Sequence, residues 1–364
     1  MVALLSWRSF LIVASGCTLA GLIILASRES AAGGPDGINR EKQAMTLARG
    51  FQLEESGRVR SAIVEFTSHP HPMGSQRQEY LAGWLESWLK KAGLKVSQQS
   101  FTVETPAWSG APKEQLVPGK PGRVRQTGHN ILAWIPRPEA ICRVLLASHY
   151  DTKRLNGDRF VGANDGASSS VALLFLAEYL NKRKKELPEK GCELHFVWFD
   201  GEEAVLPGWN DGQVSPEFGS VDNTYGSRHY VSLLRPCRKK FLCLPDETSS
   251  FPLTSMILMD MIGDRDLRLT LDRNSDPVLR TLAKKAARSL LGKDIFASWQ
   301  SIEDDHTPFI KAGIPALNLI NFEKLQHWHK PTDLPKHLSL TSMESVTKIA
   351  AFLALMQTTD ESWF

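Results

Sequence analysis

Acidic and histidine side chains recur directly after apolar segments of this chain. His149 and Asp151 follow the run VLLAS, Asp165 lies in a glycine-flanked turn, and Glu202 and Glu203 follow HFVWFDG. Three further segments repeat the pattern: MILMDMIGD with Asp260, IEDDHTPF with Glu303, Asp304, Asp305 and His306, and LQHWHKPTD with His327, His329 and Asp333. Imidazole and carboxylate ligands without cysteine suit a catalytic zinc site, in which three protein ligands leave one position open.

Taken singly, each of these residues has an ordinary interpretation as a helix cap or a solvated charge. Asp305, His306 and Asp333 fit that interpretation, or a supporting place behind metal ligands. Adjacent Glu202 and Glu203 do not, because two neighbouring carboxylates after an apolar strand repel each other unless a positive charge is close. A divalent metal is the simplest candidate. One glutamate would then bind the metal, while the other moves protons as general base and acid.

The elements that must position these residues alternate between strand-like and helical runs, which predicts an α/β fold with a mixed, mostly parallel central sheet flanked by helices. The expected strands are 95–103, 130–134, 143–148, 193–199, 255–261, 267–271 and 316–320, and the expected helices are 76–92, 167–180, 226–234, 277–291 and 342–356. Ligands of open α/β sheets bind beyond the carboxyl ends of the strands, where the acidic and histidine residues fall.

An N-terminal apolar helix is predicted over Phe10 to Ala26, which carries no charge between Arg8 and Arg28. It is either a retained transmembrane anchor or a cleaved signal segment, and both alternatives remain open. We therefore divide the chain into a membrane or signal segment at 1–29, a linker at 30–42 and one catalytic domain at 43–364. Under either alternative the domain lies outside the cytoplasm, in a periplasmic, extracellular or luminal space.

Charge and cysteine content narrow the function classes further. The formal net charge of +3 and the lack of a basic stripe interleaved with aromatics argue against a nucleic-acid partner. The five cysteines do not read as a disulfide framework, since Cys17 lies in the apolar segment and Cys142 and Cys192 open strand-like runs. Cys237 and Cys243 could form a bridge or remain as two thiols.

The motif order H-x-D, N-D, E-E, D and W-H resembles the M28 family of zinc aminopeptidases and glutaminyl cyclases, from about Pro70 to the C-terminus. The resemblance implies three zinc ligands and one catalytic carboxylate, namely Asp165, Glu203 and His329 as ligands and Glu202 as the carboxylate. His149 and Asp260 match the residues that hold a second zinc in the aminopeptidase branch. In the cyclase branch both are present although one zinc is bound, so the ligand set does not separate the branches.

Other features resemble the cyclases. Asp304 matches a cyclase aspartate that joins Glu202 and Asp260 in a hydrogen-bonded chain, and Trp328 and Trp209 match tryptophans that wall the substrate pocket. The segments RFVGA and YGSRHY also look cyclase-like. The chain departs from the animal cyclases at Ser148 and Ser170, where those enzymes carry a cysteine pair, and in a longer segment at 204–223 that makes the match of Trp209 depend on a one-residue shift.

These features predict an enzyme that acts on the N-termini of peptides or proteins. The first expectation is a glutaminyl cyclase with one zinc ion, and the alternative is an aminopeptidase with two. A catalytically inactive domain that only binds peptides is a third hypothesis. Intact Glu202 and the complete ligand set argue against that third hypothesis.

Overall fold

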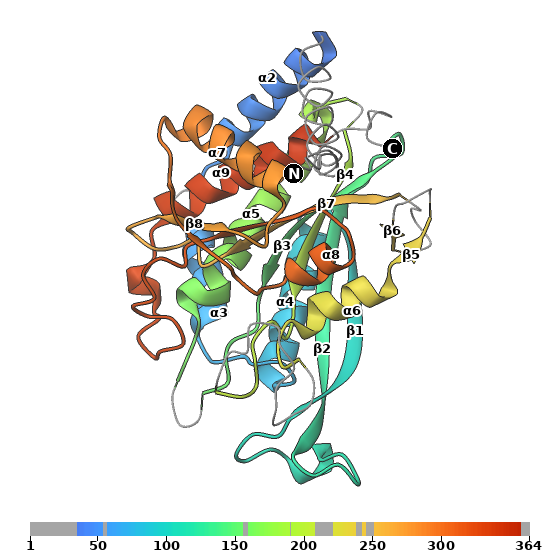
Figure 1. The fold of residues 1–364 in the computed structure, drawn as a ribbon, viewed down its shortest axis with the longest axis vertical. Coiled ribbons are helices and arrows are strands. Elements are labelled where there is room, and N and C mark those ends of the chain that lie inside the picture. Colours follow the sequence, from blue (N-terminus) through green and yellow to red (C-terminus); the bar gives the residue numbers. More distant parts are fainter. Residues whose placement is uncertain are drawn as a thin grey trace, which may run out of the picture.

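The computed structural model describes residues 35–53, 57–155, 159–189, 191–207, 221–237, 242–244 and 251–357 (Figure 1). The predicted apolar helix at Phe10 to Ala26 and the predicted pocket residue Trp209 lie outside these ranges. Among the helices within them, none has both the length and the apolar character needed to cross a bilayer.

A six-stranded mixed sheet forms the centre of the molecule. Its strands, in spatial order, are β1 (Lys95–Pro106), β2 (Arg123–Ile135), β4 (Glu193–Phe199), β3 (Arg143–His149), β7 (Leu253–Asp260) and β10 (Ala316–Ile320). The last four are parallel to one another, and β2 is antiparallel to both of its neighbours. The α/β fold with a mostly parallel central sheet is therefore confirmed, and β1 lies at one edge of the sheet.

Helices cover both faces of this sheet (Figure 1). One face packs against α2 (Pro35–Gly50), α3 (Gly57–Thr67), α4 (Gln76–Lys91), α5 (Ser169–Lys182), α7 (Pro277–Leu291) and α9 (Leu340–Met356), and the other against α6 (Tyr225–Leu233) and α8 (Thr307–Lys311). In β3, Val144 and Leu146 point into the first core and Leu145 and Ala147 into the second. Because a strand alternates its side chains, a strand buried on both faces needs such an unbroken apolar run.

Two small sheets lie outside the central one. They consist of β5 (Arg235–Pro236) with β6 (Leu242–Cys243), and of β8 (Leu269–Asp272) with β9 (Phe296–Gln300). Single-turn helices at Lys113–Gln115, Lys184–Glu186 and Pro335–His337 and an irregular helical turn at Ala163–Ser168 complete the described elements.

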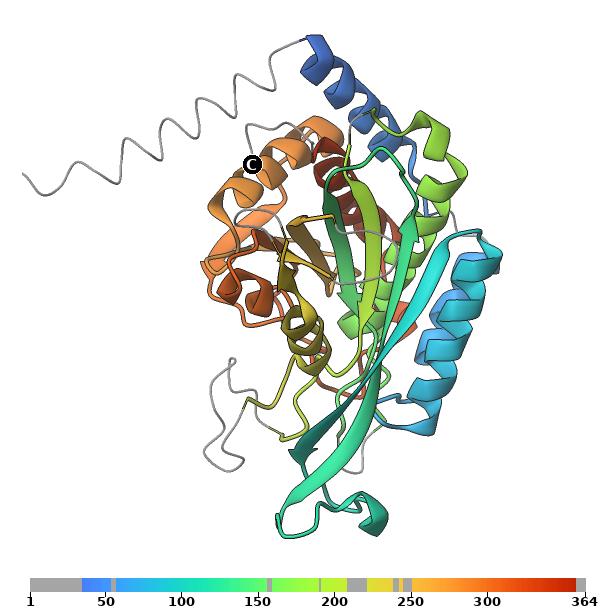
Figure 2. The same cartoon turned by 90° about the vertical axis from the view of Figure 1, so that its right-hand side faces the viewer.

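Helix α2 begins within the predicted linker at 30–42 and continues into the predicted domain. Helix α2 begins at Pro35, and Ala44, Leu47 and Ala48 in its second half are buried in the core against α9. The Pro-Asp-Gly start and the charges that follow favour a linker locally, so it is tertiary packing that stabilises this helix. The first turn of α2 lies at the end of the molecule opposite the tip of the β1–β2 hairpin (Figure 2).

The β1–β2 hairpin is longer than predicted and extends past the sheet at the carboxyl ends of β3 and β4 (Figure 2). Arg154, on the loop after β3, stacks its guanidinium 3.9 Å from the ring centre of Trp108 in the hairpin tip. The same guanidinium donates a hydrogen bond to the carbonyl of Met73 at 3.2 Å. These contacts attach the hairpin tip to the end of the sheet at which the predicted site lies.

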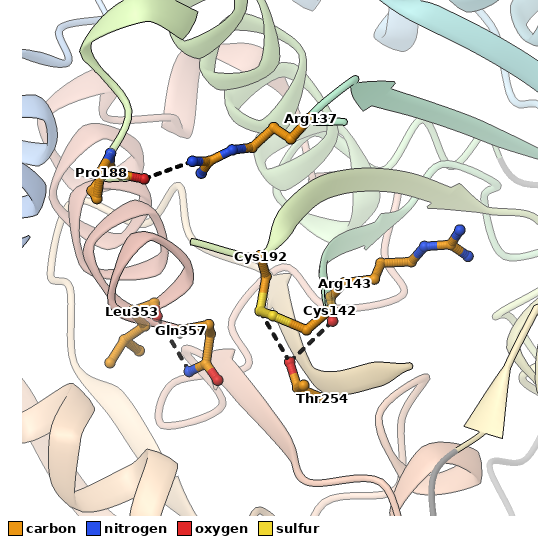
Figure 3. Close-up of a disulfide and its surroundings, with 8 residues drawn as sticks. All are labelled: Arg137, Cys142, Arg143, Pro188, Cys192, Thr254, Leu353 and Gln357. Carbon is orange, nitrogen blue, oxygen red and sulfur yellow. Dashed lines mark hydrogen bonds between the residues drawn. A yellow bond between two sulfur atoms is a disulfide. The ribbon is translucent and has the colours of Figure 1, made fainter. Parts of the chain in front are cut away.

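Two disulfides are present, and one of them contradicts the sequence-based expectation. Cys142 is bonded to Cys192 across 50 residues, and Cys237 to Cys243 across six. Arg143 and Glu193 are partners in the register of β3 and β4, so the cysteines that precede them are also side by side, with Cα atoms 4.7 Å apart. The Sγ atom of Cys192 contacts the hydroxyl of Thr254, which donates to the carbonyl of Arg143 (Figure 3). Disulfides are typical of proteins that mature in an oxidising compartment.

We expect the double substitution Cys142→Ala/Cys192→Ala to lower the free energy of unfolding by about 3 to 4 kcal/mol, because the bridge closes a long loop in the unfolded chain. Urea unfolding followed by circular dichroism measures this loss. The matched control Cys237→Ala/Cys243→Ala opens a much shorter loop and should cost less. Equal losses in the two variants would contradict the expected dependence on loop length.

Candidate active site

The predicted residues meet at the carboxyl edge of the central sheet. His149 is the last residue of β3, Asp260 is the last residue of β7, and Glu202 and Glu203 follow the end of β4 at Phe199. Since β3 lies between β4 and β7 with all three parallel, these three chain segments leave the sheet side by side. Neighbouring strands thus collect residues that are more than 100 positions apart in sequence.

Asp165, Glu203 and His329 converge on one point. His329 Nε2 lies 3.1 Å from Glu203 Oε2 and 3.5 Å from Asp165 Oδ2, and ligand atoms of all three residues fall within 4.8 Å of one another. Both carboxylates are buried, with 4% and 3% of Glu203 and Asp165 exposed. Neither oxygen of Glu203, nor Oδ2 of Asp165, has a hydrogen-bond partner among the described residues.

This arrangement fits a zinc ion. Ligand bonds of about 2.0 to 2.2 Å in a tetrahedron place neighbouring ligand atoms roughly 3.3 to 3.6 Å apart, close to the distances between His329 and the two carboxylates. Buried carboxylate oxygens that lack hydrogen bonds are costly unless a cation compensates them. Burial acts to raise the pKa of Glu203, but the facing His329 brings that pKa below its ordinary value. The Glu203 carboxylate is thus stabilised by a nearby positive charge.

The neighbouring His327, which sequence alone could not exclude as a ligand, points elsewhere. Its Nδ1 lies 3.0 Å from the hydroxyl of Thr332, and its ring stacks on His337. The ring of His329 instead stacks on Trp328, with ring centres 4.0 Å apart, and meets Phe160 edge to face at 5.9 Å. The aromatic pair fixes the imidazole of His329 toward Asp165 and Glu203.

A second group shares Asp165 with the first. His149 Nε2 lies 3.3 Å from Asp165 Oδ1 and 3.1 Å from Asp260 Oδ1, and these three residues also satisfy the spacing of a metal site. Burial acts to lower the pKa of His149, but the facing carboxylates, Asp260 foremost, raise it well above its ordinary value. A second cation could bind between the carboxylates of Asp165 and Asp260. Alternatively, a protonated His149 could supply the positive charge that both carboxylates face.

Glu202 lies beside both groups, and its backbone is held by Asp151. The Asp151 carboxylate accepts hydrogen bonds from the backbone N–H of Glu202 at 3.0 Å and of Glu203 at 3.3 Å. The Glu202 side chain is 5% exposed, and its Oε2 lies 3.9 Å from His149 Nδ1. Burial raises the pKa of the Glu202 carboxyl well above its ordinary value, and His149 offsets this only in part. A carboxyl group with a raised pKa can both accept and return a proton near neutral pH.

Asp165 is presented by an irregular helical turn at Ala163–Ser168 that Asp333 supports. The Asp333 carboxylate accepts the backbone N–H groups of Asn164 and Asp165, each within 3.0 Å. Gly166 has a left-handed φ of 94°, and a Cβ at this position would lie 2.9 Å from Cε1 of His149. Only glycine allows the turn to approach His149 this closely. Asp333 thus supports the backbone that carries Asp165, in agreement with the sequence-based interpretation that it lies behind a metal ligand.

Backbone strain is concentrated at this site. The non-glycine residues with left-handed φ among those described are Thr224, Met261 and His329. His329 has φ 50° and belongs to the group with Asp165 and Glu203, Met261 follows Asp260, and the N–H of Thr224 donates to the carbonyl of Glu202 at 2.8 Å. Strained residues persist where the surrounding structure holds them, and they cluster at functional sites.

Asp304 is buried nearby, but its observed partners differ from those expected. Its Oδ2 accepts a hydrogen bond from Asn318 Nδ2 at 2.8 Å, and its Oδ1 accepts one from the N–H of Asp305. Within the described ranges, no hydrogen bond joins Asp304 to Glu202 or to Asp260. Burial raises the pKa of Asp304 to about 7, and the like charge of Asp260 acts in the same direction.

Two further predictions from the resemblance can be compared with the structure. Trp328 packs against Phe322 and lines a cavity that reaches Asp165 and Met261. Ser148 and Ser170, which stand where animal cyclases carry cysteines, have their hydroxyl oxygens 3.1 Å apart. Ser148 near the carboxyl end of β3 and Ser170 on α5 are thus joined by a hydrogen bond. The Cys142–Cys192 disulfide instead joins the amino ends of β3 and β4.

The fold and the site place the chain in a known class of enzymes. The family model of Peptidase family M28 matches residues 130–354, more than half of the chain, and the chain belongs to this family.

Two curated relatives carry the name of glutaminyl-peptide cyclotransferases or of proteins like them. The chain is 28% identical over 248 residues to a glutaminyl-peptide cyclotransferase of Drosophila melanogaster, a match that covers 62% of this chain and 64% of the fly protein. It is 27% identical over 303 residues to a glutaminyl-peptide cyclotransferase-like protein of Bos taurus, covering 77% and 70% of the two chains. The matched part thus spans less than two thirds of the fly relative.

Solved structures show the same fold. The glutaminyl cyclase of Macrostomum lignano superposes with a TM-score of 0.65 at 24% identity, over 86% of this chain and 92% of the other.

Proposed function

We propose that this chain is a zinc-dependent glutaminyl-peptide cyclotransferase, which converts the N-terminal glutamine of peptides to pyroglutamate and releases ammonia. The observation that carries the proposal is the convergence of Asp165, Glu203 and His329 with the buried Glu202 beside them. The curated relatives named above support the cyclase branch.

In this proposal Asp165, Glu203 and His329 hold one zinc ion. Bound there, zinc would polarise the side-chain amide carbonyl of the substrate glutamine as a Lewis acid. These ligands would be the carboxylates of Asp165 and Glu203 and the imidazole of His329, which contacts Trp328 and Phe160. His149 and Asp260 remain as a hydrogen-bonded pair behind Asp165.

Glu202 acts as the proton carrier. It takes a proton from the α-amine of the substrate, which forms the new bond to the side-chain carbonyl carbon, and returns that proton to the amide nitrogen, which leaves as ammonia. Because the attacking amine and the amide belong to the same residue, proximity supplies much of the rate. Asp151 fixes the backbone of Glu202, and the like charge of buried Asp304 acts to raise the pKa of the Glu202 carboxyl. Asp260 faces His149, which lies beside Glu202.

Trp328 provides an apolar wall for the substrate beside His329, and Trp209 is proposed as a second wall from the sequence alone. An apolar pocket favours the neutral amine, which is the form that attacks. Peptide or protein N-termini are therefore the proposed partners. The predicted anchor or signal segment at 1–29 would place the enzyme in the oxidising compartment that its disulfides favour.

One alternative has a specific observation in its favour. His149, Asp165 and Asp260 form a second group with metal-site spacing, which would allow an aminopeptidase with two zinc ions and Glu202 as the base. The product would then be a free amino acid.

The two functions are separated by incubating the zinc-loaded chain with a peptide that begins with glutamine and with the same peptide beginning with leucine. We expect ammonia and pyroglutamyl peptide from the first and no free amino acid from either. Release of leucine without cyclisation would refute the cyclase proposal. Elemental analysis of the same sample should give one zinc ion per chain, against two for the aminopeptidase.

A further inference from the structure

A buried hydrogen-bond network joins helix α4 to two turns at the active-site edge of the sheet. Its centre is Gln78, in the first turn of α4, whose side-chain nitrogen donates to the hydroxyl of Tyr150 at 2.6 Å and to Asp200 Oδ2. Tyr150 directly follows β3, and Asp200 directly follows β4 and begins the turn that leads to Glu202. One side chain from a helix outside the sheet thus contacts both turns.

The two turns meet β2 through side chains, at the point where the backbone pairing of β2 with β4 ends. That pairing covers Ile131–Ile135 of β2. Two positions before it, the N–H of His129 donates to Asp200 Oδ2 at 2.7 Å, and the carbonyl of His129 accepts the hydroxyl of Tyr150 at 2.6 Å. Asp200 and Tyr150 therefore supply the hydrogen bonds that a neighbouring strand would otherwise give to His129.

Asp200 is connected to Glu202 by a single residue whose conformation is restricted. Gly201 has a left-handed φ of 69°, and a Cβ at this position would collide with Met73. The backbone N–H of Asp200 donates to Asn130 Oδ1 at 3.2 Å, which fixes the start of the turn to β2. Because one residue separates them, a movement of Asp200 is passed on to Glu202.

The glutamine at position 78 is unfavourable for stability alone. Gln78, Tyr150 and Asp200 are each at most 1% exposed, and Oε1 of Gln78 has no hydrogen-bond partner among the described residues. Ser75 and Gln78 have the spacing of a capping box, but the N–H of Ser75 donates to the carbonyl of Pro72 instead. A methionine of similar size would avoid the unsatisfied oxygen. What the glutamine adds is the pair of hydrogen bonds to Tyr150 and Asp200.

The geometry points to Gln78 as a positioning residue for Glu202 that acts through Asp200. Gln78 holds the Asp200 carboxyl group from the side of α4, and the N–H of His129 holds it from the side of β2. Without the amide of Gln78, the carboxyl group would be free to rotate about its terminal bond. The effect on turnover rests on the proposed cyclase function, in which Glu202 carries the proton, whereas the hydrogen bonds themselves do not.

Kinetics of Gln78→Met in the full zinc-loaded chain test this role. We expect kcat to fall about tenfold, less than the roughly 100-fold that a 1 Å misplacement can cause, with KM changed less than about twofold. The zinc content should not change. In the Glu202→Gln background the same substitution should cause no further loss, because the proton carrier is already absent. An unchanged kcat, loss of zinc, or additive losses in the double variant would each overturn the inference.

Gln126→Met is the matched control for losing a buried glutamine. Gln126 on β2 is also buried, donates from Nε2 to the hydroxyl of Thr105 at 2.6 Å, and has an Oε1 atom without a partner among the described residues. Its replacement should change the melting temperature without changing kcat. An equal fall in kcat for Gln126→Met would show that the effect of Gln78→Met is only structural, and would also overturn the inference.

The crystal structure of Gln78→Met, compared with that of the wild type, tests the geometry without reference to activity. We expect the Asp200 carboxyl group to be rotated and the Glu202 carboxyl group to be displaced relative to His149. If both groups were unmoved, the inference would be wrong at any level of activity. This arm gives a result even if the wild-type chain does not cyclise glutaminyl peptides, which is the outcome that refutes the proposed function.

Discussion

Replacement of Glu202 by glutamine should lower kcat for cyclisation by about 10² to 10⁴, the range that general acid and base catalysis supplies. Glutamine keeps the size and the backbone hydrogen bond to Asp151, but it cannot take a proton from the substrate amine. Glu202 is not among the residues that converge on His329, so zinc should be retained. Initial rates of ammonia release and zinc content of the same sample measure both effects.

The adjacent Glu203→Gln is the matched comparison. Glu203 faces His329 at 3.1 Å and belongs to the metal group, so this variant should lose zinc together with activity. If Glu202→Gln kept kcat within about threefold of the wild type, the role of Glu202 as proton carrier would be wrong. If Glu203→Gln kept its zinc, the assignment of Glu203 as a metal ligand would be wrong.

His329→Ala should weaken zinc binding by more than the roughly 10- to 100-fold that follows loss of an outer-shell partner, because it removes a ligand itself. Competition with a chelator followed by elemental analysis measures the affinity without reference to activity. Activity should fall in parallel and return in part at high zinc concentration.

His327→Ala provides the control two residues away. His327 contacts Thr332 and His337 and points away from the metal group, so the variant should bind zinc as the wild type does. Loss of zinc in His327→Ala, with retention in His329→Ala, would reverse the ligand assignment.

The strands and helices that position the site were largely predictable from sequence, because they are strongly periodic or continuously apolar. The predicted strand at 193–199 coincides with β4, and the strand at 143–148 ends one residue before β3 does. Their carboxyl ends carry the acidic and histidine residues. The rule that ligands bind beyond those ends therefore predicted which residues would meet, without any knowledge of the strand order.

What sequence could not supply was the order of the strands. The Cys142–Cys192 bridge follows from β3 and β4 being neighbours in register, which no local pattern reveals across 50 residues. Cysteine pairing thus depended on tertiary contacts that the spacing of five cysteines does not encode.

Supporting residues were missed for a related reason. Asp272 lies on a strand outside the central sheet, and only the pairing of β8 with β9 brings it to the segment of Asp304. Asp151 was recognised as part of the site, but its role required the turn after β4 to be seen folded against it. Hydrogen bonds between distant segments have no periodic signature in a single sequence.

The place at which α2 enters the domain has a consequence for access. Its first turn lies at the pole of the molecule opposite the hairpin tip, and the carboxyl ends of the parallel strands lie at the hairpin's end (Figure 2). If the predicted segment at 1–29 is retained as an anchor, the chain that follows it enters the domain at the pole away from Glu202.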